Sequence, residues 1–243
     1  MTWAAVADMP GLEYHAAGHR YRYRGVRIPG VTEILDVGGW TRDIPEEIRR
    51  LLRMHRARRR GLVVHDLASR RDLGENVDLH IDASTAEYMD ADTLYRQLTG
   101  FTPIDTEVCL VHPTFRYAGR YDVTGWLLTA KAEPLRVLLD RKTGMTIHPS
   151  VWLQVAAYRG LREFWYPSQR IDRTGVLLLQ PTGSQRLVWN PYEGTAWAVF
   201  ISAVWRYRWL TLLGEVRDDG AREELGPEES ITDDADDTAD FEW

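Results

Sequence analysis

The chain has 243 residues, long enough for one sizeable domain, and its 44% hydrophobic and 27% charged residues are typical of a folded globular protein. A single cysteine, Cys109, excludes a disulfide framework and any zinc or iron–sulfur site held by cysteines. The net charge of −6 conceals a basic body: residues 214–243 hold 13 acidic and 2 basic side chains, so residues 1–213 keep a net charge of +5.

The first part of the chain is expected to form a hairpin and two helical stretches. The segment 19–35 has the alternating pattern of a short hairpin turned at Gly25. A helix is predicted from 45 to 69, either unbroken or as two helices joined at Gly61. A further helix is expected over 84–98.

The remainder of the body alternates strands with helices. Strands rich in aliphatic and β-branched residues are separated by turn residues, and apolar positions at helical spacing mark the helices. The predicted order is strands over 107–111, 116–124 and 135–142, a helix over 151–164, strands over 174–180 and 185–189, and a helix over 191–213. This order predicts an α/β fold with a central mixed β-sheet flanked by helices. The high charge of residues 214–243 predicts a disordered acidic tail.

Asp140 and Lys142 follow the apolar run 135–139. They are two positions apart, and residues at that spacing on a strand point to the same face. Asp122, from the neighbouring strand, is expected to meet them. Mg²⁺ prefers oxygen ligands and needs only a few carboxylates from a protein, so two acids beside a lysine indicate a Mg²⁺-dependent phosphodiesterase. Lys142 would orient the attacking water and offset charge at the phosphate. Surface acids, and an ordinary ion pair between Lys142 and Asp140, remain the alternatives.

Four more residues are candidates on weaker patterns. Gln154 and Tyr158 are spaced i and i+4, so they share one face of a helix and could hold the lysine or a phosphate. A solvent-edge glutamine with a core tyrosine is the alternative. His65 on an apolar helix face is by itself more often a core residue than a ligand, and Glu107 is similarly ambiguous.

A dense arginine run is predicted to contact the phosphates of DNA without selecting bases. A solvated helix face is the alternative. The run consists of Arg49, Arg50, Arg53, Arg56, Arg58, Arg59 and Arg60. Arg120, beside the motif that carries Asp122, is a further predicted contact.

Together these residues resemble the RecB-type branch of the PD-(D/E)XK nucleases, which includes phage and plasmid exonucleases. The branch has Gly-x-x-x-His on an early helix, then Gly-x-x-Asp, (Asp/Glu)-x-Lys and Gln-x-x-x-Tyr. The chain carries these elements in the same order, within about residues 60–180. They are Gly61 to His65, Gly119 to Asp122, Asp140 to Lys142, and Gln154 to Tyr158.

The resemblance implies a restriction-endonuclease-like core in which His65, Asp122 and Asp140 bind Mg²⁺ or Mn²⁺, helped by the backbone carbonyl of residue 141. It implies that Lys142 is catalytic, with Gln154 and Tyr158 beside it. It matches Glu107 with an acid that some members place near a second metal or the 5′ end. The cysteines that hold an iron–sulfur cluster in some relatives are absent here.

We therefore expect a nuclease domain over 1–213 that acts on single- or double-stranded DNA. Its expected role is that of an exonuclease that leaves 5′-phosphates, in phage or mobile-element replication, recombination or DNA degradation. The alternative is a catalytically weak DNA-binding or recombination-partner protein with the nuclease fold. The acidic tail, 214–243, would then be its interface with a replication or recombination protein.

The cytoplasm of a prokaryotic cell or a phage-infected host is the expected location. The longest mostly apolar stretch, 196–205, is shorter than the roughly 18 residues that a membrane span needs. The first residues lack the pattern of a signal peptide. No membrane partner is expected, and the residues do not determine an oligomeric state.

Overall fold

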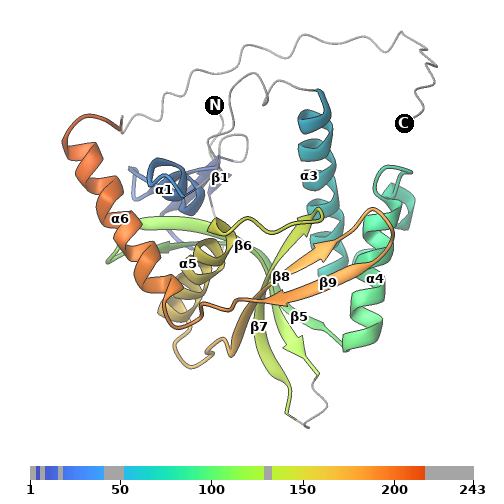
Figure 1. Cartoon of the computed structure of the whole chain (residues 1–243). Helices are drawn as coiled ribbons and strands as arrows, with labels where there is room; N and C mark the ends of the chain where they lie inside the picture. The colour runs from blue at the N-terminus through green and yellow to red at the C-terminus, as the bar shows by residue number, and fades with distance from the viewer. Residues whose placement is uncertain (1–3, 6–8, 16–18, 41–51, 129–132, 217–243) are drawn as a thin grey trace.

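A computed structural model describes residues 4–5, 9–15, 19–40, 52–128 and 133–216, with the side chains of 4–5 and 52–57 excepted (Figure 1). The small sheet contains β1 (Ala4–Ala5), β2 (Leu12–His15), β3 (Arg20–Tyr23) and β4 (Val26–Ile28). The large sheet contains β5 (Thr102–His112), β6 (Tyr117–Leu127), β7 (Leu135–Thr143), β8 (Arg173–Leu179) and β9 (Gln185–Trp189). The α-helices are α1 (Val31–Val37), α3 (Leu52–Asp72), α4 (Ala86–Thr99), α5 (Ser150–Trp165) and α6 (Ala196–Leu212), and a short 3₁₀ turn, η2, covers Asp78–His80.

The large sheet has the order β5-β6-β7-β8-β9. Neighbouring strands are antiparallel except β7 and β8, which are parallel and are joined by the crossover helix α5. A parallel pair needs such a crossover because the chain must return to the same end of the sheet. The predicted α/β fold with a mixed sheet and flanking helices is confirmed.

Helices cover both faces of the large sheet (Figure 1). One face packs against α3 and α4, and the other packs against α5, which in turn carries α6 and α1. Strand β7 is therefore buried on both sides, and Val137, Leu138 and Leu139 have no exposed surface. A strand enclosed in this way has a continuous apolar sequence. Any polar residue at the end of such a strand must find a partner inside the protein.

Most predicted elements begin and end near their expected positions. The hairpin turn at Gly25 has positive φ at both Arg24 and Gly25, as a primed two-residue turn requires. Gly100 ends α4 in the left-handed conformation, and α3 continues unbroken through Gly61. The predicted start of that helix lies outside the described residues, as do residues 217–243 of the predicted tail.

The hairpin prediction for 19–35 extended too far, because Val31–Val37 is the helix α1. Val31, Ile34 and Leu35 are buried at spacings of three and four, which is a helical pattern within a short segment. No helix in the described ranges is long and apolar enough to cross a lipid bilayer.

Candidate metal centre

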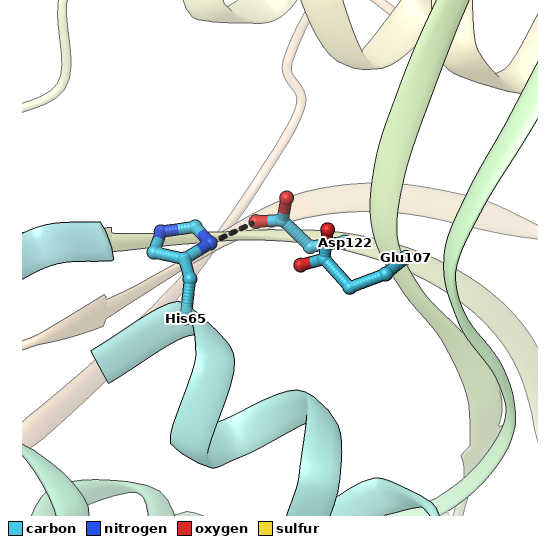
Figure 2. A group of neighbouring side chains, drawn as sticks. All are labelled: His65, Glu107 and Asp122. Atoms are coloured by element: carbon cyan, nitrogen blue, oxygen red, sulfur yellow. Dashed lines mark ion pairs between the residues drawn. The ribbon is translucent and has the colours of Figure 1, made fainter. Parts of the chain in front are cut away.

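Three side chains from three elements converge beside the large sheet (Figure 2). His65 comes from α3, Glu107 from β5 and Asp122 from β6, and all three are partly exposed. One ligand atom from each lies within 4.8 Å of the others. His65 Nδ1 is 3.4 Å from Asp122 Oδ2. Residues far apart in the chain are thus brought to one point, and the ligand roles that the resemblance implied for His65, Asp122 and Glu107 stay predictions.

Asp122 occupies the place where β6 and β7 separate. Regular pairing of the two strands extends only to Val123 and Leu139. At the next position a side chain replaces the backbone pairing, because Asp122 Oδ2 accepts the backbone N–H of Arg141 at 2.6 Å. A carboxylate held by a backbone N–H has a fixed direction, and here the oxygen faces both β7 and His65.

Glu107 has an unusual backbone conformation for a residue inside a strand. Its φ is +53°, in the left-handed region that residues with a Cβ rarely adopt. The residues on either side keep the register of β5 with β6, so no residue is inserted. The carboxylate lies 2.8 Å from Arg120 Nε. Backbone strain of this kind tends to occur at functional sites, where surrounding contacts maintain it.

Asp140 and Lys142 lie on one face of β7, as the alternation of a strand requires. Lys142 Nζ is 3.0 Å from Asp140 Oδ1 and 2.8 Å from Oδ2. The Asp140 side chain is 1% exposed and that of Lys142 is 35% exposed, so the ammonium connects a buried acid with the surface. The ion pair that the sequence left as an alternative is present. In this arrangement Asp140 lies outside the three-residue group, and its role as a ligand stays a prediction.

Gln154 and Tyr158 meet on α5, where Gln154 Nε2 donates to the Tyr158 hydroxyl at 2.9 Å. The ring of Tyr158 is buried and packs against Gly119 of β6. The tyrosine is therefore a core residue, as the alternative had it. Burial and then the negative charge of Asp140 raise the pKa of its hydroxyl. The glycine of one motif and the tyrosine of another are in direct contact.

We predict that Gly119→Ala destabilises the protein by about 1–3 kcal/mol, the usual cost of overpacking a core. A Cβ at this position would lie 2.8 Å from Tyr158 Cε1 and 3.0 Å from Val31 Cγ2, and both groups are enclosed. Urea unfolding would measure the change. Gly144→Ala is the matched control, since a Cβ there meets nothing within 4 Å. Equal stability of the two variants would contradict the packing role of Gly119.

The charges of the site oppose one another, and the pKa values reflect this. Burial, together with the Asp122 carboxylate, raises the pKa of Glu107 to about 7. Burial raises the pKa of Asp140 to about 6 despite the neighbouring Lys142. Burial would also raise the pKa of Asp122, but His65, Lys142 and the N–H of Arg141 outweigh it and hold the pKa well below its usual range.

At the basic groups His65 and Lys142, burial lowers the pKa and neighbouring carboxylates raise it. Burial lowers the pKa of His65, but Asp122 raises it more, so the net pKa lies above its ordinary value. Burial likewise lowers the pKa of Lys142, but the carboxylates of Asp140 and Asp122 raise it more, so the net pKa is raised. Without a cation, Lys142 is therefore an ammonium group that can orient a water or neutralise a phosphate.

We predict that Mn²⁺ binds more tightly as the pH rises from about 6 to 8. Carboxylates and imidazole bind a cation only after losing their protons. The pKa of about 7 for Glu107 places that loss within this range, and the raised pKa of His65 adds to it. Calorimetric titration at several pH values would measure the affinity and the protons released. A pH-independent affinity would contradict the ligand assignment of Glu107, and Glu107→Gln should reduce the dependence.

The predicted nucleic-acid contacts fall into two groups. The positions of Arg49 and the side chains of Arg53 and Arg56 lie outside the described residues. Arg60 is half-buried, with its guanidinium carbon 5.0 Å from the centre of the Tyr88 ring. Arg120 lies at the site itself, paired with Glu107 and stacked on the Tyr14 ring at 5.1 Å. These contacts place Arg120 beside the candidate metal centre.

The sequence reasoning missed a buried charged network on the other face of β7. It assigned a role only to the backbone of Arg141, whose side chain is 2% exposed and pairs with Asp72. Asp92 and Arg96 complete the network. Strand alternation could have revealed it, because a residue between Asp140 and Lys142 must point to the opposite, equally buried face. A buried arginine there requires acidic partners.

The donor set suits a divalent cation. A cation with metal–ligand distances of about 2.0–2.2 Å needs its ligand atoms roughly 3–4 Å apart. The ligand atoms of these three residues lie within 4.8 Å of one another, so a small adjustment would bring them to that spacing. A cation would also relieve the repulsion that raises the pKa of Glu107. Carboxylates suit Mg²⁺ and Mn²⁺, and the imidazole of His65 makes Mn²⁺ the more suitable of the two.

Comparison with known proteins gives a distant likeness of fold among solved structures. No family model and no curated protein matches the chain. Its fold is similar to the crystal structure of a "Putative exonuclease" from Eubacterium rectale, with a TM-score of 0.43, 11% sequence identity and 79% of each chain covered. At this TM-score the likeness carries no weight for function, which must come from the residues of the site.

Proposed function

We propose that this chain is a metal-dependent DNA nuclease that hydrolyses phosphodiester bonds. The observation that carries the proposal is the convergence of His65, Glu107 and Asp122 within 4.8 Å of one another, on the sheet whose next strand holds the Asp140–Lys142 pair. Three acids, an imidazole and a lysine on neighbouring elements can hold a cation and orient a water for such hydrolysis. The resemblance of their order in the chain to PD-(D/E)XK nucleases supports the same reaction.

His65, Glu107 and Asp122 would hold the cation, and Asp140, which is paired with Lys142, is a further candidate ligand. When bound, a divalent cation lowers the pKa of a water and offsets negative charge on the phosphate. Lys142 would orient the attacking water, and its raised pKa keeps it positively charged. Arg120, beside Glu107, would contact a neighbouring phosphate. Gln154 and Tyr158 would fix the α5 side of the site.

Cleavage from a DNA end with 5′-phosphate products is the proposed mode. The test is digestion of end-labelled linear DNA and covalently closed circular DNA with Mn²⁺, Mg²⁺ or EDTA. We expect linear DNA to be degraded only with a divalent metal, circular DNA to resist, and the products to be sensitive to phosphatase. Cleavage of circular DNA would overturn the exonuclease mode. Binding without cleavage in either metal would favour the alternative of a DNA-binding partner protein.

A further inference from the structure

Arg141 lies between Asp140 and Lys142 in the chain but sends its side chain to the opposite face of β7. Its guanidinium is almost completely buried, which is unfavourable unless the charge is paired and hydrogen-bonded. Asp72, at the end of α3, supplies that partner. Arg141 Nη1 lies 2.8 Å from Asp72 Oδ2, and Nη2 donates to Oδ1 at 3.0 Å. The first of these contacts is an ion pair without hydrogen-bond geometry and the second is a hydrogen bond, and together they hold the helix end close to β7.

The pair belongs to a network of buried charges that also includes α4. Arg96 lies 2.5 Å from Asp72 through Nη2 and 2.8 Å from Asp92 through Nε. Arg141 Nε is 3.7 Å from Asp92 Oδ1, and Arg71 Nη1 is 3.4 Å from Asp92 Oδ2. Both carboxylates are 1% exposed. The network therefore ties α3 and α4 to β7 from within the protein.

The network acts on the helix that carries His65. Asp72 follows His65 by two helical turns, so the two residues share one side of α3 about 10 Å apart along its axis. One turn before His65, Gly61 lies against the end of β7, where a Cβ would be 3.2 Å from Thr143 Oγ1. His65 thus stands between two places where α3 touches β7, and only the Asp72 contact is charged.

Arg141 acts on the other ligand as well. Its backbone N–H donates to Asp122 Oδ2, the same oxygen that faces His65 Nδ1 at 3.4 Å. One residue therefore fixes Asp122 with its amide and the His65 helix with its guanidinium. A change in the side-chain contact would move one ligand while leaving the other in place.

We propose that Arg141 and Asp72 are positioning residues of the metal centre, whose ion pair sets the distance between His65 and Asp122. The inference rests on the proposed function, since it assumes that these ligands bind a cation. Loss of a residue that orients a metal ligand typically weakens metal affinity about 10–100-fold. The same range is expected here, because neither Arg141→Lys nor Asp72→Asn removes a ligand.

The experiment is calorimetric titration of the full chain with Mn²⁺ alone, well below the melting temperature of each variant. Arg141→Lys keeps the charge and the backbone N–H to Asp122 but loses the planar guanidinium that donates to Asp72 Oδ1 and lies close to Oδ2. Asp72→Asn keeps the shape and loses the charge. Both should bind Mn²⁺ about 10–100-fold more weakly than the parent. Arg96→Lys changes the second partner of Asp72 and so loosens the Arg141–Asp72 pair without removing either member. It should weaken binding by about 2–10-fold, less than the other two variants, and it remains informative if they fail to fold.

Arg162→Lys is the matched control. Arg162 is an equally buried arginine, paired with Asp105 at 3.2 Å and with Gln169 after α5, and neither of these partners lies on α3. It should lower the melting temperature while keeping the parental Mn²⁺ affinity. Parental affinity in all three network variants would overturn the inference. A parent that binds no Mn²⁺ would instead remove the proposed metal centre, so the two failures are distinguishable.

Discussion

Lys142→Met is expected to lower the rate of DNA cleavage by at least about 10²–10³-fold, the usual loss when one preorganised charge-stabilising group is removed. The ammonium is the one cation paired with Asp140 in the described part of the chain, it is partly exposed, and the charge of the candidate ligand Asp122 helps to raise its pKa. DNA affinity should change little, because a single charge contributes a small share of phosphate binding. Single-turnover digestion with Mn²⁺ and fluorescence anisotropy in EDTA would measure the two quantities separately.

Two further variants sharpen this prediction. Lys142→Arg keeps the charge but replaces a compact ammonium with a planar fork, so it should not restore the rate. Arg159→Met is the matched control: it removes a similarly exposed cation that pairs with Glu163 and Glu193 at the outer side of α5. It should cleave like the parent. A fully active Lys142→Met protein would refute the catalytic assignment, and melting temperatures would show whether unpaired Asp140 destabilises the fold.

Asp122→Asn is expected to weaken Mn²⁺ binding by more than about 100-fold and to abolish cleavage, since losing a ligand costs more than losing a residue that orients one. The amide keeps the shape of the side chain and an oxygen that can accept the N–H of Arg141. It loses the negative charge that faces His65 and helps to hold a cation. Calorimetry with Mn²⁺ and digestion of linear DNA would test both effects.

Asp172→Asn is the control for this substitution. Asp172 Oδ2 accepts the backbone N–H of Arg136 at 2.8 Å, so it too caps an amide of β7, but at the other end of the strand. Both variants lose one carboxylate charge and retain one backbone hydrogen bond. Only Asp122→Asn should lose the metal. Equal Mn²⁺ affinity of the two variants would show that Asp122 is a structural cap and not a ligand.

Local spacing predicted correctly which side chains share a face within a single element. Asp140 and Lys142 form an ion pair because alternate residues of a strand share a face. Gln154 and Tyr158 form a hydrogen bond because they are one helical turn apart. The Gly25 turn and the end of α4 at Gly100 were also predictable, since glycine is the residue that readily adopts positive φ.

Other features had no local signal. Glu107 has positive φ without being glycine, and its contact with Arg120 depends on the pairing of two strands. Arg141 belongs to a residue type that is usually exposed, so composition argued against a buried guanidinium. The short helix α1 was mistaken for part of a hairpin because seven residues contain too few turns for a clear helical period.

The sequence by itself determined the order of the elements, the burial of the strand before Asp140, and which side chains share a face. These follow from the fixed periods of helices and strands, which are properties of the backbone. Only the tertiary structure decided that His65, Glu107 and Asp122 lie within one cation's reach while Asp140 pairs with Lys142. That outcome depends on how closely α3 packs on the sheet and where β6 separates from β7, and no local period specifies either distance.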